Sequence, residues 1–189
     1  MFNLQDMYDW SINQCVAPRV GYNQYYRNQM TVDGITYYDC SSFTFFAVWL
    51  GGGYDVGQLG FPNDLNLYHT RQANAWVVSS SERYLPLIGF TCYQMSDAYP
   101  EPGDIMIKTA THTEICYSRE PFVTMGARNR HLDLADQVAV HSSDMGYWDR
   151  FWRYGDTPPE PRPHPTPPPG PADRSKLWMM LKPYWKYGI

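Results

Sequence analysis

Two residues of this sequence, Cys40 and His112, have the types and surroundings that cysteine-based nucleophilic catalysis needs. Cys40 stands at or just inside the start of an expected helix, within the run Asp-Cys-Ser-Ser at 39–42. The partial positive charge of a helix N-terminus favours the reactive thiolate. A thiol nucleophile also needs a base, which is usually distant in sequence. His112 is the best candidate, because it begins the second of two short segments expected to be strands.

Helices in the first half of the chain are expected to carry the cysteine. Apolar residues at helical spacing predict a helix from Leu4 to Cys15, which Pro18 stops. A second, buried helix is predicted from the 39–42 run to Leu50, with the glycines at 51–53 after it. Residues 63–76 can form another helix. Residues 22–38 are polar and tyrosine-rich, so an ordered loop is expected there, and residues 79–97 favour no element.

Short strands in the second half are expected to carry the histidine. After residue 102 the pattern changes to alternation, with apolar residues two apart around 105, 115, 123, 138 and 152. Alternation with turn residues between the segments predicts an antiparallel sheet. Helices followed by a meandering sheet predict an α+β fold.

Proline and length divide the chain into a body and an appendage. The chain has 189 residues and 16 prolines, nine of which fall within 158–171. Proline fixes φ and donates no backbone hydrogen bond, so residues 157–171 are predicted to be an extended linker. The expected organisation is a catalytic body at 1–156, this linker, and a basic aromatic segment at 172–189. The chain has no run of 18 apolar residues, so no transmembrane segment is predicted. The N-terminus lacks the pattern of a signal peptide.

Charge argues against nucleic acid as a partner. The net charge is −4, and the body alone carries −7. Nucleic-acid affinity comes mainly from neutralising phosphates, so DNA or RNA binding is not expected. The last 18 residues contain four basic side chains and one acidic one. This segment is predicted to dock on anionic wall polymer or on a partner protein; the alternative is that it packs on its own body.

The remaining cysteines and histidines predict neither a metal site nor a cofactor. The four cysteines form no CxxC or metal-knuckle pattern, so free thiols are expected. The histidines form no His-x-x-x-His motif and have no accompanying carboxylate cluster, which makes a zinc amidase improbable.

Three blocks of sequence resemble the NlpC-type cysteine peptidases of bacterial cell walls, which have a papain-like fold. They are Tyr-Asp-Cys-Ser-Ser at 38–42, Pro-Gly-Asp-Ile at 102–105, and the strand led by His112. The stretch Val-Gly-Tyr-Asn-Gln-Tyr-Tyr-Arg-Asn at 20–28 looks closest to the phage branch, which includes peptidoglycan amidases and endopeptidases. The resemblance covers the chain from the first helix to about Tyr154.

The resemblance implies a role for several residues. Cys40 would be the nucleophile and His112 the base. Tyr22 would stabilise the oxyanion together with the backbone N–H of Cys40. Asp39 and Ser41 match positions that hold the free amine of the stem peptide in endopeptidases, although Asp39 could simply be the helix cap.

The residue that orients the histidine departs from the family pattern. The family's usual interval from His112 leads to Thr124, which can accept a hydrogen bond but has no charge. Asn129 or a backbone carbonyl are the alternatives. Arg128 would share the face of Thr124 on a strand, and its charge would disfavour an imidazolium.

Two functions follow from these expectations. The first is a phage-type peptidoglycan hydrolase that cleaves an amide bond in or next to the stem peptide, as an N-acetylmuramoyl-L-alanine amidase or an endopeptidase. It would act from the host cytoplasm through a holin, or from the virion. The second is a virion or tail-associated structural or wall-binding protein that keeps a degenerate papain-like fold, an alternative that the uncharged Thr124 and the basic aromatic segment at 172–189 motivate.

Overall fold

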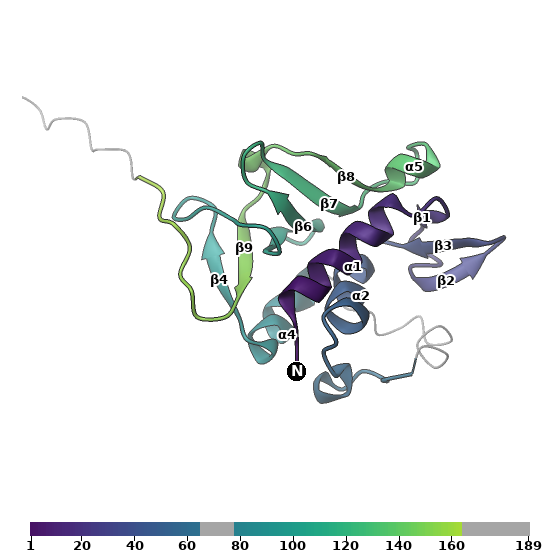
Figure 1. The fold of residues 1–189 in the computed structure, drawn as a ribbon, viewed down its shortest axis with the longest axis horizontal. Coiled ribbons are helices and arrows are strands. Elements are labelled where there is room, and N and C mark those ends of the chain that lie inside the picture. The colour runs from purple at the N-terminus through teal and green to yellow at the C-terminus, as the bar shows by residue number, and fades with distance from the viewer. Residues whose placement is uncertain (65–77, 164–189) are drawn as a thin grey trace, which may run out of the picture.

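A six-stranded antiparallel sheet, built by the second half of the chain, forms the larger layer of the protein (Figure 1). The computed structural model describes residues 1–64 and 78–163. The strands are β4 (Phe90–Gln94), β5 (Ile105–Lys108), β6 (His112–Ser118), β7 (Val123–Ala127), β8 (Val138–Ser142) and β9 (Arg150–Tyr154). Their order in the sheet is β4-β9-β5-β6-β7-β8, with every neighbouring pair antiparallel. The five strands predicted from alternation are confirmed as β5 to β9.

Helices from the first half pack against this sheet. Helix α1 (Leu4–Val16) begins where Asn3 accepts hydrogen bonds from the backbone N–H of Gln5 and Asp6, and it ends just before Pro18. Helix α2 (Cys40–Phe46) continues into a π-helical turn, η1 (Ala47–Gly51). These two predicted helices are confirmed, and so is the α+β class. The short helices are η2 (Val56–Leu59), η4 (Val78–Ser80), α4 (Ser81–Ile88), α5 (Leu134–Gln137) and η5 (Met145–Tyr147).

The prediction of an ordered loop at residues 22–38 is wrong. This region contains most of a small second sheet, in which β3 (Ile35–Tyr38) lies between β1 (Val20–Tyr22) and β2 (Asn28–Val32). Asp33 and Gly34 connect β2 to β3 with φ values of 53° and 76°. An Asp-Gly pair with both φ values positive is the preferred two-residue hairpin turn. The region 79–97, for which no element was favoured, holds α4 and β4. The helix expected at 63–76 lies almost wholly within residues 65–77, which are outside the described residues.

The large sheet is buried on both faces, and this fixes its position against the helices. Ile105, Ile107 and Ile115 belong to the main core, which also contains the phenylalanines of α2. Met106 and Cys116 alternate with them and belong to a second cluster. Since side chains point alternately to the two faces of a strand, both patterns are satisfied at once. Helix α2 is thereby held against β6 and β7.

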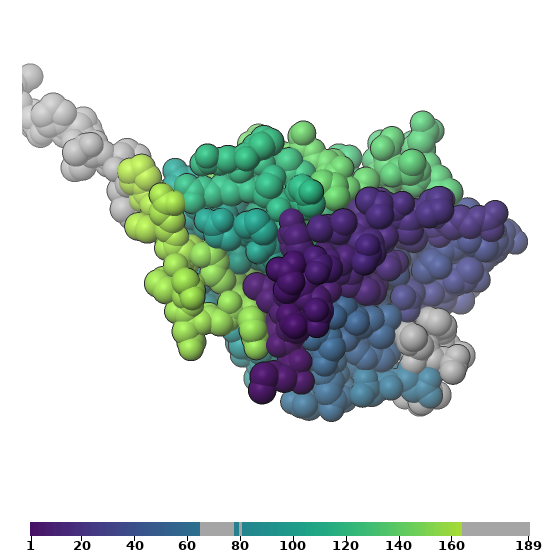
Figure 2. Space-filling view, viewed as in Figure 1, coloured from purple at the N-terminus to yellow at the C-terminus, as the bar shows by residue number. Residues whose placement is uncertain are grey.

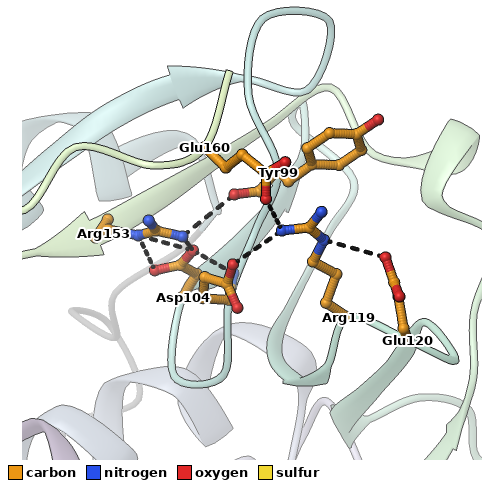
Figure 3. Close-up of polar contacts among 7 residues, drawn as sticks. Tyr99, Asp104, Arg119, Glu120, Arg153 and Glu160 are labelled. Atoms are coloured by element: carbon orange, nitrogen blue, oxygen red, sulfur yellow. Dashed lines mark hydrogen bonds and ion pairs between the residues drawn. The ribbon is translucent and has the colours of Figure 1, made fainter. Parts of the chain in front are cut away.

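A buried ion pair joins β5 to β9. Asp104, immediately before β5, accepts hydrogen bonds from Nε and Nη2 of Arg153 and from the backbone N–H of Glu101 (Figure 3). Both charged side chains are almost fully buried. Burial raises the pKa of Asp104, and the bonds from Arg153 and Glu101 act in the opposite direction. The Pro-Gly-Asp-Ile block therefore has a structural use in this chain, because its aspartate ties two strands together.

The first residues of the proline-rich segment pack on the body. Residues 157–163 return along the connection between β4 and β5 (Figure 2), where the Tyr99 N–H donates to the carbonyl of Glu160 at 2.9 Å. The guanidinium carbons of Arg119 and Arg162 lie 4.3 Å and 4.6 Å from the centre of the Tyr99 ring. Arg119 also forms an ion pair with Glu160 at 2.5 Å (Figure 3). The body expected to end near Asp156 thus has ordered contacts up to Arg162.

None of the helices within residues 1–64 and 78–163 is long and apolar enough to cross a membrane. The basic aromatic segment predicted at 172–189 lies outside the described residues.

Candidate active site

Local sequence places Cys40 at the first position of α2. Asp39 is the N-cap: its carboxylate accepts the Ser42 N–H at 2.7 Å, while Ser42 Oγ accepts the Asp39 N–H at 2.9 Å. This reciprocal capping box satisfies two of the donors that a helix start leaves free. Asp39 also accepts a hydrogen bond from Arg27 at 3.0 Å. The backbone that presents the thiol is therefore held at fixed geometry.

His112 lies at the start of β6 and lines one cleft together with Cys40. Nε2 of His112 is 2.8 Å from Oε1 of Glu114. Burial disfavours the charged imidazolium, but the nearness of Cys40 and the hydrogen bond with Glu114 outweigh it and raise the pKa of His112 to about 10. At neutral pH the ring of His112 is therefore cationic; it lines the cleft beside Cys40 and is bonded to the carboxylate of Glu114.

Glu114 is the centre of a buried polar network that spans three adjacent strands. Its side chain is 1% exposed and contacts His112, the hydroxyl of Thr124 on β7, and Nε2 of His141 on β8 at 2.9 Å. Burial by itself would raise the pKa of Glu114, but His112 and His141 outweigh it and lower this pKa to about 2. Gly126 leaves room for the side chain of Glu114, since a Cβ at position 126 would lie only 2.9 Å from Glu114 Cγ.

The indole of Trp148 fixes the plane of the His112 ring. The two rings stack with centroids 5.7 Å apart and an interplanar angle of 21°. Trp148 is itself buried and donates its indole N–H to Ser143 Oγ at 3.0 Å. A stacked aromatic face also favours a cationic imidazole through the ring quadrupole. The histidine is thereby held in orientation by two independent contacts.

Tyr22 lies in the same cleft as the thiol and the imidazole. The cleft has a volume of about 630 Å³, and its walls include Tyr22, Cys40, His112, Glu114 and Trp148. The pKa of Tyr22 is raised by burial and further by the nearness of Cys40 and Asp39. Tyr22 thus remains a hydroxyl, able to donate a hydrogen bond toward a group bound at the thiol.

Asp39 and Ser41 lie away from the cleft. Both side chains are buried, and Ser41 Oγ donates to Asp39 Oδ1 at 3.0 Å. Together with Ser42 and Arg27, this contact occupies both oxygens of the Asp39 carboxylate. The structure thus places the two residues in the capping cluster of α2, which is the alternative named above for Asp39, and the amine-binding role stays a prediction.

The residue that contacts the histidine is Glu114, not Thr124. Thr124 reaches the imidazole only indirectly, through its hydrogen bond to Glu114. Among the alternatives, Asn129 uses Oδ1 to accept the backbone N–H of His131 at 2.9 Å. Arg128 is exposed on the cleft wall. The expectation of an uncharged orienting group is therefore replaced by a buried carboxylate.

Sequence reasoning missed Glu114, His141 and Trp148. For Glu114 a signal was available, since His112 and Glu114 are two apart on a predicted strand and such residues share a side. The interval counted from the family led instead to the next strand. His141 reaches Glu114 because it pairs opposite Thr124, and this register is not visible in the sequence.

The other candidate chemistries find little support in the described chain. All four cysteines are free. Burial raises the pKa of Cys15 to about 12 and raises that of Cys92 and Cys116. In residues 1–64 and 78–163, no group of three His, Cys, Asp or Glu side chains is placed to hold a metal ion.

Comparisons of the chain with protein-family models, with curated proteins and with solved structures found no match. The proposed function therefore rests on the chemistry of the site and on the motif resemblance.

Proposed function

We propose that this protein is a cysteine amidohydrolase with a papain-like, NlpC-type fold, acting on bacterial peptidoglycan. The observation that carries the chemistry is the meeting, in one cleft, of a thiol at a helix N-terminus and a histidine held by a buried carboxylate. Substrate class comes from the three sequence blocks that resemble the cell-wall peptidases of phages. The bond cleaved is an amide in or next to the stem peptide.

Acylation is the first half of the proposed reaction. His112, which is cationic at neutral pH, already holds the thiol proton, and the thiolate sulfur of Cys40 attacks the amide carbonyl carbon. The oxygen that becomes negative accepts hydrogen bonds from the Cys40 backbone N–H and the Tyr22 hydroxyl. Preorganised donors of this kind lower a barrier by about 3–4 kcal/mol each. His112 then gives its proton to the leaving amine, which leaves a thioester on Cys40.

Deacylation restores the enzyme. A water molecule gives a proton to His112 and adds to the thioester carbonyl, and the thiolate leaves as the carboxylic acid product forms. Glu114 stays ionised throughout and stabilises the imidazolium in both halves, as the buried carboxylate of a catalytic triad does. His141 and Thr124 hold Glu114 in place and act as positioning residues.

The alternative of a structural or wall-binding protein with a degenerate site rested on Thr124 and on the segment at 172–189. A carboxylate contacts His112 in the structure, so the first ground no longer favours it, while the second lies outside the described residues.

The test is hydrolysis of purified cell walls, followed by turbidity and by mass spectrometry of the released fragments. Wild-type protein should clear the walls, and Cys40→Ala and His112→Ala should not. Cys92→Ala is the matched control, because Cys92 is a half-buried thiol on β4, outside the cleft. Full clearing by Cys40→Ala would refute the mechanism. The fragment masses would identify the bond and separate an amidase from an endopeptidase.

A further inference from the structure

A second groove opens from the wall of the catalytic cleft. It has a volume of about 510 Å³ and lies between the end of β1 and the loop that joins β7 to α5. Tyr22, Gln24, Arg128 and Asn129 line both spaces, so the groove and the cleft are continuous. A substrate bound at Cys40 can therefore extend into the groove.

The groove is cationic in a protein whose body is acidic. Arg128, Arg130 and His131 line it, and among the described residues no Asp or Glu does. Arg128 and Arg130 are exposed, and neither has an ion-pair partner within residues 1–64 and 78–163. Two unpaired guanidinium groups beside a catalytic cleft concentrate anionic ligands there, because clefts lined by one sign of charge focus the field.

The positive charge of the groove lies close to Tyr22, which also lines the catalytic cleft. Tyr22 and Arg130 line the groove together, and the charge of Arg130 acts to lower the pKa of Tyr22 against the larger effect of burial. The groove also carries neutral amide groups from Asn23, Gln24 and Asn129 and the ring of Tyr25. This mixture of forked cations, amides and an aromatic face suits a peptide segment with a carboxylate better than it suits an apolar group.

We propose that this groove is a substrate subsite that binds a free carboxylate of the stem peptide, with Arg128 and Arg130 as its anion-binding residues. This inference rests on the proposed function and deepens it, since it names the part of the substrate beside the scissile amide. Guanidinium groups bind a carboxylate by donating two parallel hydrogen bonds, so the subsite distinguishes a free glutamyl carboxylate from its amide.

The experiment uses two muramoyl tripeptides that differ only in whether the glutamyl residue carries a free carboxylate or an amide. Their binding to full-length Cys40→Ala protein is measured by titration calorimetry, and their cleavage by wild-type protein is measured by chromatography. The tested variant is Arg128→Gln with Arg130→Gln, made in both backgrounds. The control is Arg83→Gln, an exposed arginine on α4 that lies outside the groove.

We expect about tenfold tighter binding of the acid than of the amide, the size of one charge-assisted hydrogen bond. The double variant should lose this preference, and Arg83→Gln should keep it. Equal binding of both tripeptides, or a preference that survives in the double variant, would overturn the subsite. Arginine-dependent binding of a glycerol phosphate polymer without any acid preference would overturn it too.

Failure of the proposed function would look different. If wild-type protein cleaves neither tripeptide nor walls while Cys40→Ala protein keeps the arginine-dependent preference, the subsite stands and the hydrolase proposal fails. If walls are cleared but the acid and amide are bound and cleaved alike, the hydrolase stands and the subsite fails.

Discussion

At the scale of single residues, the candidate site combines a pair that the sequence predicts with a network that it does not. Cys40 could be singled out because a capping residue precedes it and an apolar run follows it. His112 could be singled out because it begins a strand. Glu114 depends on the same strand alternation, whereas His141 depends on strand register, which residue types alone do not determine. Individual reactive positions were therefore easier to predict than the partners that orient them.

Replacing Glu114 by Gln should reduce hydrolysis far more than it disturbs the fold. The amide keeps the shape of the side chain but removes the charge that stabilises the His112 imidazolium. We expect the rate of wall hydrolysis to fall by about 10²-fold or more, the usual size of a general acid–base contribution. Glu82→Gln, an exposed glutamate paired with Arg150 on another surface, is the control. A Glu114→Gln protein within twofold of wild type would remove Glu114 from the mechanism.

The His112–Glu114 pair also predicts how stability depends on pH. The pKa of Glu114 is lowered from 4.5 to about 2 on folding, so its contribution is present above pH 4.5 and is lost as pH falls toward 2. The pKa of His112 is raised from 6.5 to about 10, so its contribution is complete below pH 6.5 and is lost as pH rises toward 10.

The difference in unfolding free energy between wild type and Glu114→Gln should therefore be largest between pH 4.5 and 6.5. Urea unfolding of both proteins at a series of pH values measures this difference, and subtracting one curve from the other removes the titration of unrelated groups. A difference that does not change with pH would mean that the two side chains are not coupled in the folded protein.

At the scale of elements, the long helices and the antiparallel meander could be predicted from periodicity, and the small sheet could not. Strands β2 and β3 are short, partly exposed and rich in polar residues, so they show little of the alternation that marks a half-buried strand. Their best local signal is the turn at Asp33 and Gly34, which outweighs the weak strand pattern. This sheet matters for the site because it carries Tyr22 at the end of β1.

The start of α2 provides a test that separates helix capping from substrate binding. Asp39→Ala removes the cap and leaves Arg27 without its carboxylate, and we expect a loss of about 2 kcal/mol in unfolding free energy. Asp39→Asn retains a capping oxygen and loses only the charge, so its stability should lie between those of wild type and Asp39→Ala. Urea unfolding and KM for a soluble muropeptide are the two measurements. A large rise in KM for Asp39→Asn with unchanged stability would support the amine-binding role.

At the scale of the whole molecule, composition predicted a boundary that packing moves. Proline content changes abruptly after Asp156, and residues 157–163 form neither a helix nor a strand of the sheet. Extended chain can nevertheless pair with an exposed backbone edge, and Pro161 does so by forming an isolated bridge with Ala98. Composition thus indicates which conformations a segment can adopt, whereas its contacts depend on the surface beside it.

Two truncations isolate the contribution of residues 157–163. A chain that ends at Pro163 retains Glu160 and Arg162, whereas a chain that ends at Asp156 loses both and uncovers one face of Tyr99. Pro159 is buried in this segment, so the shorter chain also exposes apolar surface on the body. We expect its Tm to be lower than that of the longer chain by about 2–4 °C, the shift typical of one modest interaction in a protein of this size.

Because both chains lack residues 164–189, the difference in Tm reports only the packed segment 157–163. Tyr99→Ala in the longer chain should reproduce much of this difference. Equal Tm values for the two truncated chains would mean that residues 157–163 add no stability and that the stable body ends at Asp156.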